Sequence, residues 1–218
     1  MTAANVDHSP FSAEGFASRA AMRLSQRPDP DAGAVAAGDH DLNPDLYPAG
    51  TRPRQQPAAV LAPIVARPGG ATVLLTRRAS HLRNHSSQIP FPGGKIDASD
   101  VSPQAAALRE AREEIGLDER HVRPIGWLDP YQTGSGFRVY PLVGIVDAAF
   151  TLEINRHEVE EVFEAPLEFL MNPRHHLRVE REINGVDRAF YAMPWGDRYI
   201  WGATAGMLLN LYRRLYAP

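Results

Sequence analysis

The sequence predicts an α/β fold, built as an α+β sandwich of strands and helices. Segments with strand character alternate with amphipathic helical segments along most of the 218-residue chain. Turn signals separate these segments, and the clearest are Pro68-Gly69-Gly70 and Asn184-Gly185, which predict β-hairpins. Hydrophobic residues make up 44% of the chain, which is enough to form a buried core.

Strands are expected from residue 57 onward. Pro63 lies inside the first of them and predicts an edge strand or a bulge, because proline has no backbone N–H to donate to a neighbouring strand. In chain order, the expected strands are 58–66, 71–77, 121–129, 137–146, 159–163, 177–183 and 188–193.

Helices are expected at 102–115, 167–171 and 202–216. Ser102 can cap the first helix, Pro103 suits its first position, and Gly116 suits the position just after its end. The closing helix carries an apolar stripe, which predicts that it packs on the core. That stripe consists of Met207, Leu208, Leu211 and Leu215.

Residues 1–56 differ in character from residues 57–218, which are expected to form the main domain. A short helix is expected within 11–26, with Phe16, Ala20 and Leu24 on one side and Ser12 as its cap. Prolines and Ala/Gly residues follow, as in a linker. We therefore interpret 1–56 as an N-terminal arm with a short helix and a Pro-rich linker.

Composition excludes several classes of function. The net charge is −3 and the pI is near 6.2, so we expect neither a nucleic acid nor a membrane as partner. The chain has no cysteine, which excludes disulfides, thiol nucleophiles and cysteine-ligated metal centres. No apolar run is long enough to span a membrane, and no secretory signal is visible at the N-terminus. A cytoplasmic protein is expected.

Three glutamates on the 102–115 helix are the first candidates for chemistry. Glu110 and Glu114 are four residues apart, so their carboxylates repel one another on the helix surface. A divalent cation removes this conflict, and oxygen donors at this spacing suit Mg²⁺ or Mn²⁺. A solvated acidic surface is the alternative explanation. Glu110, Glu113 and Glu114 are expected opposite an apolar face that consists of Ala105, Leu108, Ala111 and Ile115.

The glycines upstream of this helix favour the first explanation, because Gly93-Gly94 lets the backbone approach a ligand closely. Together with residues 109–117, they resemble the Nudix box: a Gly, an acid, then Arg-Glu-apolar-x-Glu-Glu-x-Gly-apolar. Two features depart from the commonest form. The gap from Gly94 to Arg109 is one residue longer, and the acid is Asp100 or Asp97 where Glu is usual.

A second motif lies within residues 74–94. It resembles the motif of the coenzyme A pyrophosphatase branch of the Nudix hydrolases, which also shows the longer gap. One position differs, because Ser87 stands where Gly is expected. The Phe-Pro-Gly-Gly stretch at 91–94 and the start of the closing helix at 201–206 also resemble this branch. The resemblance covers about residues 57–216 and implies a mixed β-sheet packed between helices.

The resemblance implies hydrolysis of coenzyme A or acyl-CoA to 3′,5′-ADP and (acyl-)4′-phosphopantetheine, with Mg²⁺ or Mn²⁺ as cofactor. The basic residues near the metal helix suit a substrate with several phosphates. The expected metal ligands are Glu110, Glu113, Glu114 and Gly94. The expected catalytic residues are Arg109, Glu113, Glu114 and Glu158, with the identity of the general base left open. The expected substrate-binding residues are Arg77, Arg78, Arg83, His85, Gly93, Gly94 and Lys95.

Three alternatives stay open at this point. The chain could hydrolyse another nucleoside diphosphate derivative, such as ADP-ribose or an oxidised nucleotide. It could be a non-catalytic nucleotide-binding module, although the intact glutamate set argues against that. The arm at 1–56 could support a homodimer.

Overall fold

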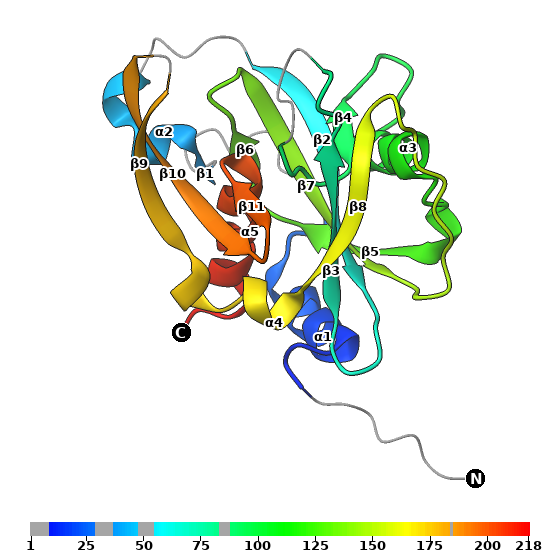
Figure 1. Cartoon of the computed structure of the whole chain (residues 1–218). Helices are drawn as coiled ribbons and strands as arrows, with labels where there is room; N and C mark the ends of the chain where they lie inside the picture. The colour runs from blue at the N-terminus through cyan, green and yellow to red at the C-terminus, as the bar shows by residue number, and fades with distance from the viewer. Residues whose placement is uncertain (1–8, 29–36, 48–54, 83–87, 184) are drawn as a thin grey trace, which may run out of the picture.

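The computed structural model describes residues 9–28, 37–47, 55–82, 88–183 and 185–218 (Figure 1). These residues form an eight-stranded mixed sheet in which the strand path runs β1-β6-β7-β2-β3-β8, with β4 on β2 and β5 on β7. The strands are β1 (Ala37–Gly38), β2 (Gln56–Val65), β3 (Thr72–Arg78), β4 (Gly93–Lys95), β5 (Val122–Trp127), β6 (Tyr131–Gln132), β7 (Phe137–Val146) and β8 (Val159–Pro166).

A smaller antiparallel sheet and several helices complete the described fold. The small sheet contains β9 (Leu177–Ile183), β10 (Val186–Trp195) and β11 (Arg198–Trp201). The α-helices are α1 (Ala13–Arg23), α2 (Asp39–Leu42), α3 (Pro103–Ile115), α4 (Leu167–Leu170) and α5 (Ala203–Leu215). The 3₁₀ turns are η1 (Pro44–Leu46), η2 (Glu119–His121) and η3 (Pro173–His175). The mixed α/β fold expected from the sequence is therefore present.

All of the expected strands from 58 onward appear, and β7 has the expected bounds. Both hairpins are present, because β2 pairs antiparallel with β3 and β9 pairs antiparallel with β10. The sequence missed β1, β4, β6 and β11, which span two to four residues each. Strands this short carry too few alternating side chains to show a period of two.

The expectation that Pro63 marks an edge or a bulge is wrong. The β2 strand lies inside the sheet and pairs in parallel with β7 along all of its residues. On its other side, β2 pairs with β4 at Ala58–Val60 and with β3 only at Ile64 and Val65. The missing N–H of Pro63 falls between these two pairings, on the side where Leu61 donates to the Pro92 carbonyl. Pro63 thus lies in the gap between β4 and β3, the two strands that pair with this edge of β2.

The large sheet is covered on both faces. Alternate residues of β2 point to opposite sides, so Ala59 and Leu61 join the cluster under α3, whereas Val60 and Ala62 join the cluster under α5. Figure 1 shows α3 on one side of the sheet and α5 with the small sheet on the other. The expected apolar stripe of α5 is buried: Met207, Leu208, Leu211 and Leu215 are all inaccessible or nearly so.

Much of the N-terminal segment lies against this body. The helix α1 begins after Ser12, whose side chain accepts a hydrogen bond from Gly15 N–H, and it buries Phe16 and Ala20 in the cluster that contains α5. Further along, β1 pairs in parallel with β6. The boundary at residue 56 therefore stays a proposal for where the domain begins. No helix of the described residues has the length and apolar character needed to cross a membrane.

One charged network joins the β2–β3 turn to β8. Arg67 donates two hydrogen bonds to the carboxylate of Glu164, at 3.0 and 2.6 Å, and Thr72 Oγ1 donates a third at 2.5 Å. The hydrogen bond from Arg67 is the main reason why the pKa of Glu164 lies below its usual value. A lowered pKa means that Glu164 stabilises the fold above about pH 4.5 and that this contribution is lost as the pH falls.

We predict that Glu164→Gln lowers the free energy of unfolding at pH 7 by about 1 kcal/mol, because a charge-assisted pair is lost. The difference from the wild type should shrink as the pH approaches 3. Urea unfolding at pH 7 and pH 3.5 measures it, with the exposed Glu168→Gln as the matched control. A Glu164→Gln effect that is independent of pH would contradict this assignment.

Candidate active site

The glycine loop is held between two strands of the large sheet. Backbone hydrogen bonds run from Leu61 N–H to the Pro92 carbonyl and from Thr76 N–H to the Pro90 carbonyl, so the segment 88–92 separates β2 from β3. Its continuation, β4, pairs with β2. This insertion brings Gly93 and Gly94 against α3, which packs over β2 and β4.

Neither glycine leaves room for a side chain. A Cβ atom on Gly93 would lie 2.5 Å from the Ala59 carbonyl oxygen, and the residue has a φ of +151°. A Cβ atom on Gly94 would lie 2.6 Å from the carboxylate of Glu110. The Gly94 backbone and the Glu110 carboxylate are therefore in direct contact, which a larger residue would prevent.

The α3 helix has the expected ends but not the expected faces. Ser102 caps it by accepting from Ala105 N–H, Pro103 is its first residue, and Gly116 follows it in the left-handed conformation with a φ of +69°. The expectation that all three glutamates lie opposite the apolar face is wrong for Glu114, whose exposure is 3%. The buried face consists of Ala106, Ala107, Ala111, Glu114 and Ile115.

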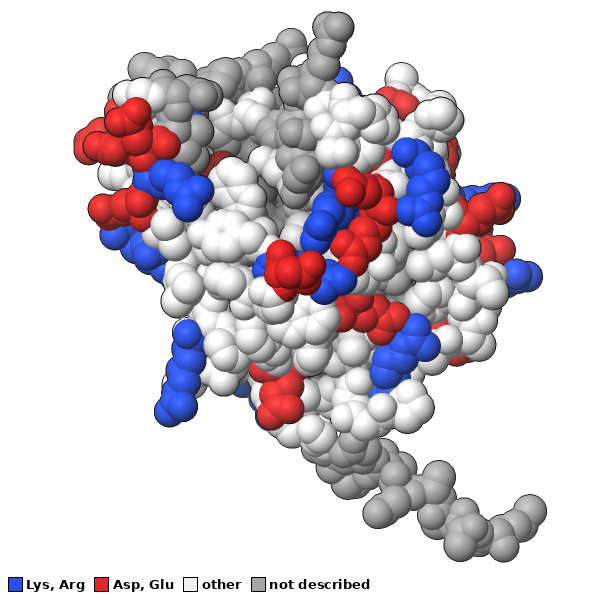
Figure 2. All heavy atoms as spheres, in the orientation of Figure 1, with Lys and Arg blue, Asp and Glu red and all other residues white. Residues whose placement is uncertain are grey.

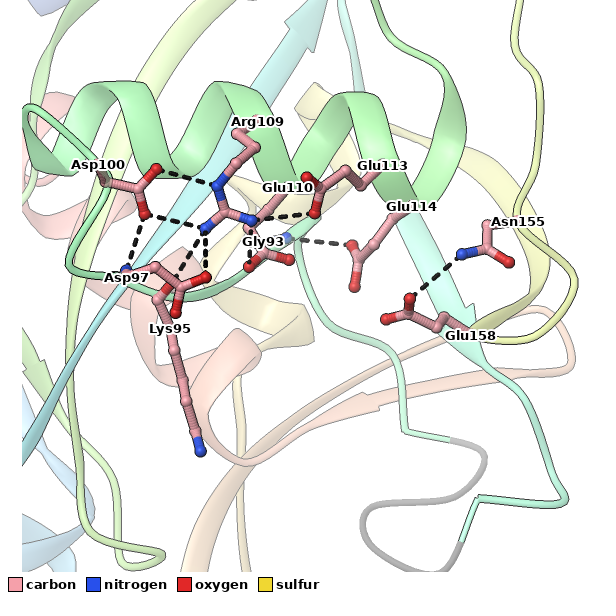
Figure 3. A network of polar contacts seen from close by, with 10 residues as sticks. All are labelled: Gly93, Lys95, Asp97, Asp100, Arg109, Glu110, Glu113, Glu114, Asn155 and Glu158. Carbon is pink, nitrogen blue, oxygen red and sulfur yellow. Dashed lines mark hydrogen bonds and ion pairs between the residues drawn. The ribbon is translucent and has the colours of Figure 1, made fainter.

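Arg109 donates hydrogen bonds to most of the acidic side chains on this surface (Figure 3). Its guanidinium donates to both carboxylate oxygens of Asp100 at 2.9 Å, to Glu110 at 3.0 Å and to Glu113 at 2.9 Å. It also donates to the Lys95 carbonyl at 3.2 Å. These contacts place the expected Arg109–Glu113 pair, and they lower the pKa of Asp100, chiefly through the Arg109 hydrogen bond.

Glu114 is the most perturbed acid of the site. Its carboxylate accepts a hydrogen bond from Gly93 N–H at 3.1 Å, which stabilises the charged form. Burial acts against this and dominates, and the charges of Glu110 and Glu158 add to it, so the pKa of Glu114 rises to about 8. Burial is also the largest cause of a raised pKa at Glu110. In Figure 3, Glu114 and Glu158 point into the same space beneath α3.

Glu158 reaches this space from the loop before β8. Asn155 Nδ2 donates to Glu158 Oε1 at 3.2 Å, and Asn155 N–H donates to the Glu114 carbonyl at 2.9 Å. Glu153 N–H is bound in the same way to the Ile115 carbonyl. The loop is thus tied to the end of α3, and Asn155 orients Glu158. The sequence contained no signal for Asn155, because this contact joins a loop to a helix about forty residues away.

The basic residues separate into two groups. Along β3, Arg78 shares the α3 face with Leu74, whereas Arg77 shares the opposite face with Leu75. The charge of Arg78 lowers the pKa of Glu114, and its Nε is buried without a hydrogen-bond partner among the described residues. Arg77 instead contacts its cross-strand partner Glu161 at 3.3 Å.

Lys95, another expected substrate-binding residue, does not join Arg78. The exposed Lys95 side chain points away from the glutamates in Figure 3, and its Nζ lies 6.0 Å from the ring centre of Phe137. Arg83 and His85 lie outside the described residues, as does Ser87. Figure 2 shows acidic and basic side chains in direct contact at the centre of this face.

The acidic cluster is chemically suited to a divalent cation. The charges of Glu110 and Glu158 raise the pKa of Glu114, and the charge of Glu158 also raises the pKa of Glu110, so negative charge accumulates where burial already disfavours it. Their oxygens are hard donors of the kind that Mg²⁺ and Mn²⁺ prefer. No three His, Asp or Glu side chains of the described residues yet converge as a complete ligand set, since Arg109 holds Glu110 and Glu113. A cation must compete with this guanidinium.

A pH titration of the metal-free protein tests this electrostatic picture. A carboxyl whose pKa is raised to about 8 stabilises the fold below its usual pKa of 4.5, and this contribution is lost as the pH rises through 8. Glu114→Gln removes the titration but keeps an acceptor for Gly93 N–H. We predict that the variant gains about 1–3 kcal/mol relative to the wild type between pH 5 and pH 9 in EDTA. Parallel stability curves across this range would refute the assignment.

Comparisons with known proteins identify the family of this chain. The family model of the NUDIX domain matches residues 55–188. Proteins named "Uncharacterized Nudix hydrolase NudL", from Yersinia pestis (strain Pestoides F) and Yersinia pseudotuberculosis serotype O:1b (strain IP 31758), are each 43% identical over 160 residues, which covers 72% of this chain and 79% of theirs. A solved Nudix hydrolase from M. smegmatis, RenU, is 28% identical with a TM-score of 0.42, covering 52% of this chain and 72% of that one. The chain belongs to the Nudix domain family.

Proposed function

We propose that this Nudix protein hydrolyses the diphosphate bond of coenzyme A or acyl-CoA, releasing 3′,5′-ADP and (acyl-)4′-phosphopantetheine. One observation carries the hydrolase part: the buried Glu114 carboxylate accepts a hydrogen bond from Gly93 N–H and is acted on by the charges of Glu110, Glu158 and Arg78, with Gly94 beside Glu110. The narrower choice of coenzyme A rests on the 74–94 motif and on the arginines of β3.

The residues of the chain have separate tasks in this proposal. Glu110, Glu113 and Glu114, with the Gly94 backbone, hold a divalent cation. When bound, such a cation neutralises charge on the two phosphates and lowers the pKa of water. Arg109 orients Glu110 and Glu113 through the hydrogen bonds that it donates to them. Asp100 in turn holds Arg109 through two oxygens.

The reaction also needs a group that takes the proton of the attacking water. Glu158 is the proposed base, because it lies near Glu114 on a different element than the helix and is oriented by Asn155. A glutamate of α3 is the alternative. Arg78 is the proposed phosphate contact, since its planar fork suits phosphate oxygens and its Nε has no partner among the described residues. Arg77 adds positive charge for the substrate phosphates from the other face of β3.

A product analysis with purified full-length protein tests the function. With coenzyme A and Mg²⁺ or Mn²⁺, we expect 3′,5′-ADP and 4′-phosphopantetheine, separated by chromatography. Glu114→Gln should lose activity on the order of 100-fold or more, because a buried cation ligand is neutralised. The exposed Glu168→Gln is the matched control, and it should keep wild-type activity.

Each alternative outcome points to a different function. Intact coenzyme A together with cleavage of ADP-ribose or an oxidised nucleotide would refute the substrate and keep the hydrolase. Binding of a nucleotide without any cleavage would favour the non-catalytic module.

The two neighbouring arginines of β3 give a second, sharper test. We predict that Arg78→Ala lowers kcat/KM roughly 10- to 100-fold, as expected for the loss of hydrogen bonds to a charged group. Arg77→Ala should have a smaller effect, because Arg77 is already engaged by Glu161. Steady-state kinetics of both variants decide the order. An equal loss of kcat/KM in both variants, or a larger loss in Arg77→Ala, would show that the phosphates do not bind at Arg78 on the α3 side of β3.

A further inference from the structure

A cavity of about 410 Å³ lies on the sheet face opposite α3. Val60 lines it from the large sheet and Phe91 from the glycine loop, whereas Phe190 and Trp201 line it from the small sheet. Part of its wall comes from residues 38–47, which precede the 55–188 match to the family domain. We call residues 38–47 the strap.

The strap is fastened first at β6. Asp39 accepts a hydrogen bond from the Tyr131 hydroxyl at 2.8 Å through one oxygen and from Gly134 N–H at 2.7 Å through the other. Burial is the main cause of a raised pKa at Tyr131, and the neighbouring Asp39 charge adds to it, so this hydroxyl stays protonated and remains a donor. This end of the strap is therefore held by two charge-assisted bonds.

The strap is fastened again at β10. Asn43 Nδ2 donates to the Ala189 carbonyl at 2.9 Å, and Ala189 N–H donates to Asn43 Oδ1 at 2.7 Å. The side-chain amide thus pairs with the backbone of β10 as a neighbouring strand would. Asn43 Nδ2 also donates to the Asp39 carbonyl at 2.7 Å, which joins the two attachment points. The strap bridges the large sheet and the small sheet across the cavity.

Tyr47 is the strap residue that lines the cavity without making these bonds. Its hydroxyl lies close to Gly134, where an added Cβ atom would be 2.2 Å away. Leu46, its neighbour, is exposed and does not line this cavity. Tyr47 therefore shapes the wall of this cavity, whereas Leu46 on the same strap does not.

The cavity and the acidic cluster are joined by the glycine loop. Residues 88–91 line the cavity, and Gly93 and Gly94 follow at the glutamates. Because the two lie on opposite faces of the sheet, a ligand that occupies both must bend round the loop on a long arm. Most of the lining side chains are apolar or aromatic, and of the two charged ones Asp39 has both oxygens engaged. The other is Arg188, whose Nε is buried without a partner among the described residues. The apolar wall suits an uncharged arm, and Arg188 offers a donor for an amide carbonyl of that arm.

We infer that the strap is a specificity element that this chain adds to the Nudix domain, with Tyr47 shaping a cavity for the uncharged (acyl-)pantetheine arm of the substrate. The inference rests on the proposed function. Asn43 is a positioning residue, which acts through β10, and Tyr47 contacts the arm.

Kinetics with a set of related substrates test the strap in the full chain. KM and kcat are measured for coenzyme A, dephospho-coenzyme A and acyl-CoA esters of increasing chain length. Tyr47→Ala should shift the ratio of KM values between long-chain and short-chain esters by about tenfold, with kcat nearly unchanged. Tyr47→Phe should shift this ratio less than Tyr47→Ala because it keeps the ring, and Leu46→Ala is the matched control on the same strap. Asn43→Ala should produce the same shift, with thermal unfolding measured to exclude loss of fold.

A binding measurement that does not need hydrolysis separates the two proposals. Ligand-observed NMR with pantetheine in EDTA should show binding to the wild type and weaker binding to Tyr47→Ala. If coenzyme A is cleaved but Tyr47→Ala matches Leu46→Ala in every ratio, the strap inference fails and the proposed function stands. If coenzyme A is not cleaved while Tyr47-dependent pantetheine binding persists, the proposed function fails and the assignment of the cavity to pantetheine stands. A shift confined to the ratio between coenzyme A and dephospho-coenzyme A would place the nucleotide half in the cavity and overturn the assigned occupant.

Discussion

The burial of one carboxylate constrains the whole site. Glu114 lies under α3 at 3% exposure, and the single hydrogen bond from Gly93 N–H only partly offsets its loss of water. An acid in this position is costly to the fold when it is charged and alone. The same cost is a driving force for a cation, since positive charge in this space restores the ionised form. The packing that buries Glu114 therefore also prepares the site to bind a cation.

The splaying of β2 from β3 admits the glycine loop, whose Gly93 N–H binds that carboxylate. The two strands share only two residue pairs, and the segment 88–92 takes the vacant hydrogen bonds. Pro63 fits at this gap because its ring nitrogen has no proton to leave unsatisfied. The loop then delivers Gly93 to β2, where backbone atoms exclude a side chain, and Gly94 to the carboxylate of Glu110. Backbone pairing of β4 with β2 sets the position of this loop.

Charge is arranged in layers around this point. Arg109 holds Asp100, Glu110 and the exposed Glu113, so one guanidinium offsets part of the negative charge on the outer side of α3. Of the basic groups in the described part of the chain, Arg78 is the one whose charge acts on the buried Glu114. The negative charge that remains favours a cationic ligand. On the other face of the sheet, the strap and the small sheet enclose a largely apolar space, which completes the division between charged and uncharged parts of a substrate.

The sequence by itself determined the longer strands, the capped helix and the spacing of its glutamates, because these are local features. Ser102, Pro103 and Gly116 act on their own turn of backbone, and the glutamate spacing along α3 is fixed by helical geometry. Only the tertiary structure decided that Glu114 is buried while Glu113 is exposed, since the depth of a helix face depends on what packs against it. It also separated Arg77 from Arg78, placed Pro63 inside the sheet and brought Asn43 to Ala189. Each of these contacts joins segments far apart in the chain, and no local pattern of residues records such a meeting.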